Sequence, residues 1–164
     1  MDTLKLTEKD FIKEEYYNKY VGKVDLSSFE GNLEIDECLG WCRFVSLNVS
    51  GYIIAKAGTG IKAGEGIEAG WGIKAGLSIS CKTILKAELK IFAGICYWRE
   101  ITDSGKTVTC GKLEGKIEYG ILNEVGLPEV KQDTIKIVID GKILNLDRKL
   151  ASELNQLLDK LIKS

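Results

Sequence analysis

A six-residue repeat constrains the fold of this chain more than any other feature of its sequence. From Ile53 the sequence divides into seven hexads: IIAKAG, TGIKAG, EGIEAG, WGIKAG, LSISCK, TILKAE and LKIFAG. A period of six does not match the 3.6 residues per turn of an α-helix. It is typical of a solenoid in which each hexad forms one short strand and one corner. The repeat therefore predicts a mainly β fold, a hexapeptide-repeat β-solenoid (β-helix).

Two places in each hexad repeat, and both are predicted to point into the core. Alternate residues of a strand share a face, so the third and fifth side chains point inward and the fourth outward. The third places are Ala55, Ile61, Ile67, Ile73, Ile79, Leu85 and Ile91. The fifth places are Ala57, Ala63, Ala69, Ala75, Cys81, Ala87 and Ala93. Eight of the 18 glycines lie between Gly51 and Gly76, where they would let the backbone turn its corners.

Three hexads would close one coil of 18 residues. Strands one coil apart would then pair in parallel, with each residue opposite the residue 18 positions later. The pairs this predicts are Ile61 with Ile79, Ile67 with Leu85, Ile73 with Ile91, Ala75 with Ala93, and Glu68 with Lys86.

The segments on either side of the solenoid, assigned to residues 24–126, have a different character. Residues 1–23 are predicted to hold an N-terminal helix, because Thr7 and Asp10 resemble a capping box. The apolar residues of that helix would share one face; they are Phe11, Ile12, Tyr16 and Tyr20.

Residues 127–164 are predicted to form a hairpin–helix appendage. Asp140-Gly141 between two alternating apolar runs indicates a β-hairpin. An amphipathic helix capped by Asp147 would follow, with an apolar stripe made of Leu150, Leu154, Leu157, Leu158, Leu161 and Ile162. A hairpin and one helix are too small to be stable alone, so docking on the solenoid or homodimerisation is expected.

The chain contains no histidine, which removes the commonest general base and metal ligand. Hexapeptide-repeat acyltransferases share this type of coil but use a histidine base, so the chain is predicted not to be an enzyme and to need no cofactor. Three weaker alternatives remain. Cys38 and Cys42 could begin a zinc site, Gly58-Thr59-Gly60 could begin a phosphate loop, and paired carboxylates such as Glu14-Glu15 could serve a glycosidase.

The sequence also bears on location. No run of 18 apolar residues is present, and Met1–Asp10 has no apolar core of a signal peptide. A cytoplasmic protein is therefore expected, without membrane contact and with its five cysteines reduced.

The first place of the later hexads is unexpectedly apolar. It holds Trp71, Leu77, Leu89 and Ile95, although corners should be exposed, and Tyr97 and Trp98 follow closely. Trp71 is expected near Leu89, and Leu77 near Ile95. Such apolar ridges need a cover. The cover would be either the chain's own terminal helix or hairpin, or a partner or second subunit.

Charge suggests another surface. Residues 52–99 contain seven basic and three acidic side chains, and Lys62, Lys74 and Lys86 occupy outward places of their hexads. A lysine-rich face near exposed aromatic residues would suit weak nucleic-acid contact. The whole chain, with 23 basic and 24 acidic residues, has no bulk charge of that kind.

The Gly-x-Ile-x-Ala-Gly hexads resemble those of bacterial β-solenoid proteins such as bactofilins, which are polymerising scaffolds. Residues 45–122, with the segments around Phe92–Arg99 and Cys110–Leu113, also resemble small proteins of phages and mobile elements. That resemblance implies a non-enzymatic, protein-binding inhibitor of a host defence protein such as a CRISPR nuclease (anti-CRISPR-like). The alternatives are a self-assembling bactofilin-like scaffold and a nucleic-acid-binding protein.

Overall fold

The computed structural model describes residues 1–128, 134–139 and 142–147. The chain divides into two compact units, Met1–Pro128 and Glu129–Ser164, which are described separately.

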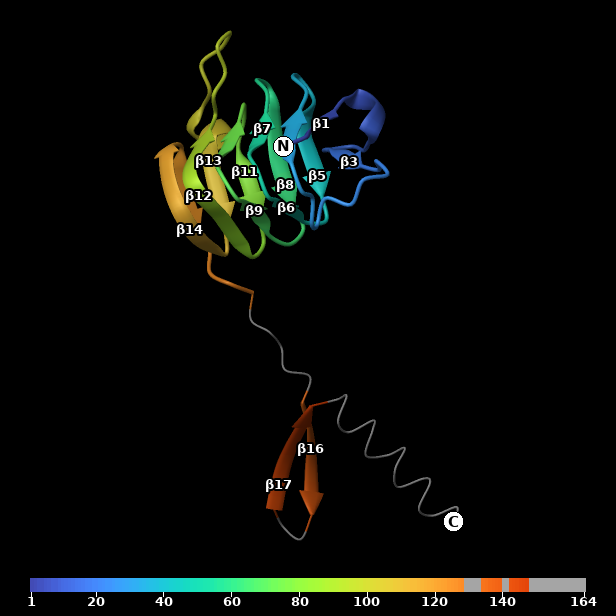
Figure 1. Cartoon of the computed structure of the whole chain (residues 1–164). Coiled ribbons are helices and arrows are strands. Elements are labelled where there is room, and N and C mark those ends of the chain that lie inside the picture. The colour runs from blue at the N-terminus through green and yellow to red at the C-terminus, as the bar shows by residue number, and fades with distance from the viewer. Residues whose placement is uncertain (129–133, 140–141, 148–164) are drawn as a thin grey trace. The chain divides into compact units, whose positions relative to one another are not determined.

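The first unit consists almost entirely of short strands (Figure 1). Its strands are β1 (Thr3–Leu6), β2 (Phe11–Lys13), β3 (Asn18–Tyr20), β4 (Asn32–Ile35), β5 (Gly40–Phe44), β6 (Leu47–Val49), β7 (Ile53–Ala55), β8 (Thr59–Ala63), β9 (Ile67–Ala69), β10 (Ile73–Ala75), β11 (Ile79–Cys81), β12 (Ile84–Ala93), β13 (Thr107–Cys110), β14 (Lys112–Tyr119) and β15 (Ile121–Glu124). Single 3-10 turns are formed by Glu8–Asp10 and Asp103–Lys106.

The strands form curled parallel sheets around one interior. One sheet has the order β15-β13-β11-β8-β5-β3-β2. The other has the order β1-β4-β7-β10-β12-β9-β6, with β14 beside β12. The long strand β12 pairs with β9 through its first half and with β10 through its second half. This sheet therefore has two parts that share β12.

We divide the strands of this unit into three sets by their pairing and call them faces I, II and III. Face I comprises β1, β4, β7, β10 and the C-terminal parts of β12 and β14. Face II is the seven-stranded sheet. Face III comprises β6, β9 and the N-terminal parts of β12 and β14.

The predicted strand pairs are confirmed. Ile61 lies opposite Ile79, and Ile67 lies opposite Leu85. Ile73 and Ala75 lie opposite Ile91 and Ala93, and Glu68 lies opposite Lys86. Each of these residues thus lies beside the residue 18 positions later.

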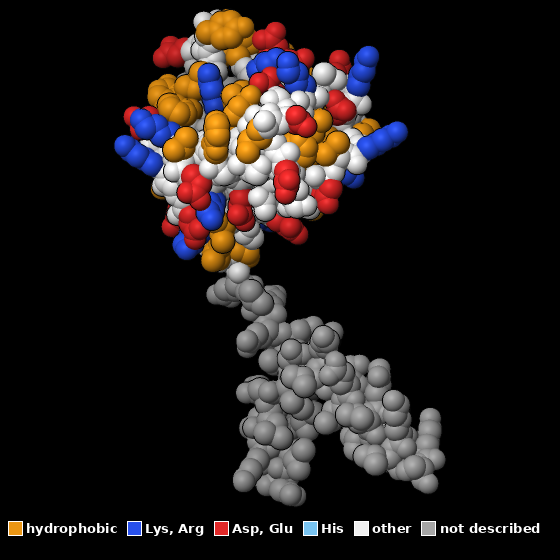
Figure 2. All heavy atoms as spheres, in the orientation of Figure 1, with side chains coloured by type: hydrophobic (Ala, Val, Ile, Leu, Met, Phe, Trp, Pro, Cys, Tyr) orange, Lys and Arg blue, Asp and Glu red, His pale blue; other side chains and the backbone are white. Residues whose placement is uncertain are grey.

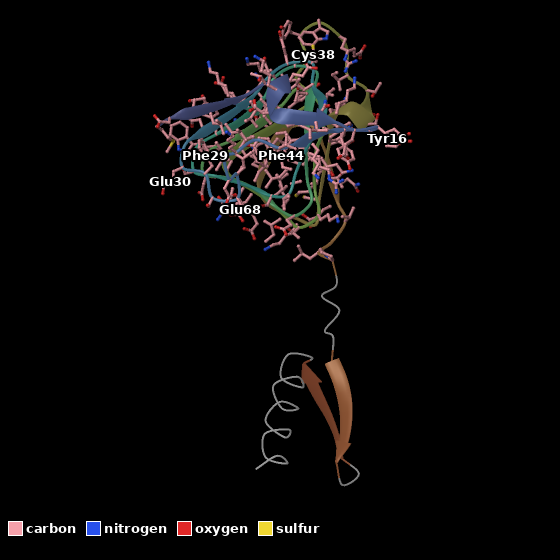
Figure 3. The ribbon with its side chains drawn as sticks, turned by 90° about the vertical axis from the view of Figure 1, so that its right-hand side faces the viewer. Tyr16, Phe29, Glu30, Cys38, Phe44 and Glu68 are labelled. Atoms are coloured by element: carbon pink, nitrogen blue, oxygen red, sulfur yellow. The ribbon has the colours of Figure 1, made fainter. Side chains whose placement is uncertain are left out.

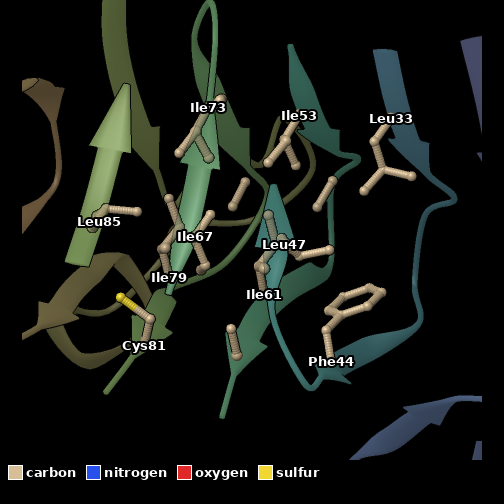
Figure 4. Close-up of a cluster of buried hydrophobic side chains, with 14 of the residues drawn as sticks. Leu33, Phe44, Leu47, Ile53, Ile61, Ile67, Ile73, Ile79, Cys81 and Leu85 are labelled. Atoms are coloured by element: carbon tan, nitrogen blue, oxygen red, sulfur yellow. The ribbon is translucent and has the colours of Figure 1, made fainter. Parts of the chain in front are cut away.

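The third and fifth places of the hexads are buried, as predicted, and form most of the core (Figure 4). Six of the seven third-place residues are branched aliphatics, and each is at most 1% exposed. The fifth place takes only alanine and cysteine, and each of these residues is at most 7% exposed.

The spacing of 18 residues holds only in the centre of the unit. Ile53, rather than Ala55, lies opposite Ile73, so the expected frame of the first hexad is wrong by two residues. Further along the chain, Ile79 lies opposite Val108 because the segment between β12 and β13 contains additional residues.

The predicted N-terminal helix is wrong. Asp10 does accept the Thr7 N–H at 2.8 Å, but the turn it closes is a single 3-10 turn. β2 and β3 then form an antiparallel hairpin in which Phe11 lies opposite Tyr20. The two rings meet Phe44 at centroid distances of 5.9 and 5.6 Å, which buries aromatic area that a lone helix would leave exposed.

Figure 3 shows the molecule turned by 90°, with Phe44, Tyr16 and Cys38 among the labelled residues. Phe44 lies in the interior, whereas Tyr16 and Cys38 lie at the periphery. The first 23 residues therefore belong to the sheets of the first unit, as β1, β2 and β3.

In the second unit, β16 (Thr134–Ile139) and β17 (Lys142–Asp147) pair antiparallel, with Ile139 opposite Lys142. The predicted Asp140-Gly141 turn and the final helix lie outside the described residues.

Candidate protein-interaction surface

The outward side chains of face I form one continuous row across six strands. They are, in order, Lys5, Glu34, Ile54, Lys74, Phe92 and Tyr119. Three of the six are large and apolar or aromatic, although this side of the sheet points away from the core. Tyr119 is 47% exposed.

One apolar ridge borders face I where it meets face III. Trp71 and Leu89 lie on neighbouring turns, because the Leu89 N–H donates to the Trp71 carbonyl at 2.9 Å. Their side chains are 52% and 61% exposed, so the expected adjacency and the expected exposure are both found. We call this pair the Trp71 ridge.

A second ridge borders face I on the opposite side, where it meets face II. The Gly94 N–H donates to the Leu77 carbonyl at 3.0 Å, which places Leu77 beside Gly94 and Ile95. Both side chains are half-buried. Leu77 follows Trp71 by six positions, so the chain allows at most about 20 Å between the two ridges.

The loop after β12 extends this second ridge with two aromatic rings. Tyr97 and Trp98 pack edge to face, with ring centroids 4.6 Å apart. Tyr97 is 82% exposed and its hydroxyl lies 3.5 Å from the Glu37 carboxylate. The far end of the loop is held where the Ser78 hydroxyl donates to the Ser104 carbonyl at 2.6 Å. We call Leu77, Ile95, Tyr97 and Trp98 the loop ridge.

Hydrophobic and charged side chains are mixed on the surface of the first unit. In Figure 2 hydrophobic side chains lie between charged ones on the side of this unit turned to the viewer. Exposed Trp71 and Leu89 lie at the border of a face that also presents Phe92 and Tyr119. Tryptophan and tyrosine are enriched in surfaces that bind proteins.

The expected single lysine face is not formed. Lys62 lies on face II, Lys74 on face I and Lys86 on face III. Consecutive strands of the repeat belong to different faces, so residues 12 apart point in different directions. Lys86 lies between Glu68 and Glu114, which offset its charge.

Face II contains a basic cluster that the sequence analysis missed. Arg43 lies beside Lys62, and both line a hollow of about 390 Å³ together with Lys82, Ser80 and Thr109. Arg43 and Lys62 are separated by an irregular 19 positions, so the 18-residue spacing gave no signal for their contact.

The guanidinium of Arg43 also contacts the N-terminal hairpin. It lies 4.8 Å from the centroid of the Tyr17 ring and donates a hydrogen bond to the Tyr17 hydroxyl. The N-terminal hairpin thus orients one of the three cations of this hollow.

The cysteines considered for a zinc site occupy different environments. Cys38 is exposed, whereas Cys42 is fully buried on face II. Burial raises the pKa of the Cys42 and Cys81 thiols to about 12, so both stay protonated at neutral pH. Within residues 1–128 and the two strands of the second unit, no group of three potential ligands could hold a metal ion.

The glycines considered for a phosphate loop belong to a corner and to the strand that follows it. Gly58 adopts a positive φ of 76° before β8, and Gly60 lies within that strand. No helix follows them, so the strand–glycine–helix arrangement of a phosphate loop is not formed in this segment.

Among the helices of the described segments, none has the length and apolar character to cross a membrane. Comparison of the chain with known protein families, with curated proteins and with solved structures finds no match.

Proposed function

We propose that the chain is a non-enzymatic β-solenoid that binds another protein through face I and its two bordering ridges. The observation that carries this proposal is the exposure of Trp71 and Leu89 side by side at the border of a face that also presents Phe92 and Tyr119.

The solenoid part of the proposal is supported by the order of pairing. β7 pairs with β10 and β10 with β12, while β8 pairs with β11 and β11 with β13. β9 likewise pairs with β12 and β12 with β14. Strands β7, β8 and β9 each meet the strand three places further on, as in a chain that winds through three faces per coil. From β10 onward the step falls to two, because the long strand β12 belongs to two of the faces.

The binding part is supported by what the surface offers. Tryptophan and tyrosine bury large areas at little entropic cost, and they are enriched where partners bind. The parallel strands beneath them hold both ridges on a rigid support, so a partner would meet a surface that is already formed. That the partner is a host defence nuclease, such as a CRISPR nuclease, stays a prediction from the resemblance.

A photo-crosslinking residue at position 71 tests the proposal directly. It would replace Trp71 in one variant and Glu68, on face III, in a matched control. In extract of the source organism, adducts of one defined mass are expected from position 71 and not from position 68. Leu89→Glu, combined with the crosslinker at position 71, should lower the adduct yield about tenfold. Equal adducts from positions 71 and 68 would contradict the proposal.

Nucleic-acid binding is a second candidate, and the specific observation behind it is the hollow lined by Arg43, Lys62 and Lys82. It predicts DNA or RNA binding that weakens as salt rises, since phosphate contacts release counterions. The double variant Arg43→Glu/Lys62→Glu should abolish this binding, whereas Lys74→Glu on face I should leave it unchanged. Binding that is indifferent to both would remove this candidate.

A further inference from the structure

The end of the first unit formed by β14 and β15 is poorly covered in the described part of the chain. Leu85 and Ile91 in β12 are fully buried. Their counterparts in β14, Leu113 and Ile117, are only half-buried, and Leu122 in β15 is 45% exposed. In Figure 2 hydrophobic side chains gather where the chain leaves this unit.

β14 is also an edge strand. It pairs with β12 on one side, and no other described strand pairs with it. The Glu124 carboxylate accepts the Leu113 N–H at 2.9 Å, which shows that this N–H points away from β12. A free edge with a partly exposed apolar side is a template for pairing with another strand.

The side chains of β14 identify the strand that fits this edge. Residues 112–118 read Lys-Leu-Glu-Gly-Lys-Ile-Glu. At equal distances on the two sides of Gly115, this segment carries side chains of opposite charge. In an antiparallel pair of two such strands centred on Gly115, Lys112 would face Glu118 and Glu114 would face Lys116. Leu113 would face Ile117 in the same register. Opposite charges directly across an antiparallel pair stabilise it.

The shape of β14 agrees with this register. The strand passes from face III to face I, and its pairing with β12 shifts between Glu114 and Lys116. Gly115 lies at the shift, with a φ of 147°, and a Cβ there would lie 2.7 Å from the Ala87 carbonyl oxygen. A two-fold axis through Gly115 would place face III of one copy beside face I of the other. The bend of each strand would then match the bend of its partner.

We propose that a second copy of this chain covers this end, through antiparallel pairing of the two β14 strands about Gly115. The interface is isologous, so the same patch serves both copies and the assembly closes at two. The Leu113 N–H would exchange the Glu124 carboxylate for a backbone carbonyl of the partner. This inference goes beyond the proposed function, because it uses the end of the unit and leaves face I free.

Charge reversal and its rescue test the register in the full-length protein. Glu118→Lys would place a second ammonium group opposite that of Lys112, twice in the dimer. The dissociation constant from sedimentation velocity at low salt should rise about tenfold. Adding Lys112→Glu would restore opposite charges between the copies and return the dissociation constant to near its original value. Circular dichroism would verify that both variants are folded.

The rescue separates pairing between copies from contacts within one copy. Within the chain, Lys112 lies 2.7 Å from Glu114, and Lys116 lies 3.4 Å from Glu118. The double variant turns both of these contacts into like-charge pairs, so only pairing between copies can account for a rescue. A full-length protein that is monomeric at all concentrations would overturn the proposal and would favour cover by the chain's own residues 129–164. A dimer that Glu118→Lys leaves unchanged would also overturn it.

Discussion

The two ends of the first unit differ in how they finish the same parallel core. At the N-terminal end, Phe11 and Tyr20 pack against Phe44, and the core residues Leu6 and Leu26 are at most 4% exposed. At the other end, the last strand before Pro128, β15, is exposed at all four of its residues. We call the first of these the closed end and the second the open end.

The difference shows what a repeat cannot supply for itself. Each strand inside the stack is covered by the strands on both sides, so the repeat alone buries the centre. The terminal strands need to be covered by a segment that lies outside the repeat. The chain uses an aromatic hairpin for this purpose at one end, and the described residues offer no equivalent at the other.

The largest expected effect comes from removing the aromatic cover. Phe44→Ala deletes a ring that is 3% exposed and contacts two others, so the free energy of unfolding should fall by about 3–4 kcal/mol. Leu122→Ala at the open end should cost about 1 kcal/mol or less at low protein concentration. Urea unfolding followed by circular dichroism measures both. Similar costs for the two variants would mean that both ends are equally covered.

A smaller effect concerns the order in which buried thiols become reactive. Cys42 lies toward the closed end and Cys110 toward the open end, one on β5 and the other on β13. Burial raises the pKa of both thiols, so both are protonated and unreactive at pH 8 until the structure opens. In urea concentrations below the unfolding transition, alkylation of Cys110 should be about tenfold faster than that of Cys42.

Mass spectrometry of the alkylated peptides identifies the labelled residue. The exposed Cys38 provides an internal standard, since it should react first under all conditions. If Cys42 reacted before Cys110, the closed end would be the first to open and the comparison would be reversed.

The smallest effect comes from an exposed ion pair on the closed half. The Lys56 ammonium donates to the Asp36 carboxylate at 3.0 Å and holds the pKa of that carboxyl below its usual value. A lowered folded pKa stabilises the fold above the unfolded pKa of about 3.9, and this contribution is lost as the pH falls through the folded pKa.

Asp36→Asn should therefore lower stability slightly at pH 7, and the difference from the original protein should vanish in acid. Urea midpoints at pH 7 and at a pH well below the unfolded pKa of about 3.9 measure this. At a protein concentration too low for the proposed dimer, Glu118→Gln is the matched variant at the open end, because Lys90 and Lys116 lower the pKa of Glu118 in the same way. A difference for Asp36→Asn that persisted in acid would show that its cause is not the ion pair.

The centre of the fold could be predicted from the sequence because its rule is local. Each hexad fixes one strand, one buried aliphatic residue and one corner, so Ile61 and Ile79 could be paired by counting. The corner exposure of Trp71 and Leu89 followed from the same count. Outside the hexads the number of residues between paired strands changes, and counting no longer identifies the partner.

The N-terminal hairpin and the basic hollow could not be predicted for related reasons. The capping pair Thr7 and Asp10 does form, but the burial of Phe11 and Tyr20 against Phe44 depends on a contact across more than 20 residues. Tertiary packing of this kind overrides local helix signals. The contact between Arg43 and Lys62 depends on strand pairing before the regular hexads, where paired residues are 19 positions apart.

The long segment between β12 and β13 has a consequence for how such a chain can change. Val108 lies beside Ile79, and Thr109 beside Ser80, although the chain leaves the stack and returns through a loop that includes Tyr97 and Trp98. The ladder is thus insensitive to how many residues connect successive strands. New sequence can be added at this corner without altering the register on either side. Exposed positions such as Glu100 and Thr102 would be suitable places to display a foreign peptide.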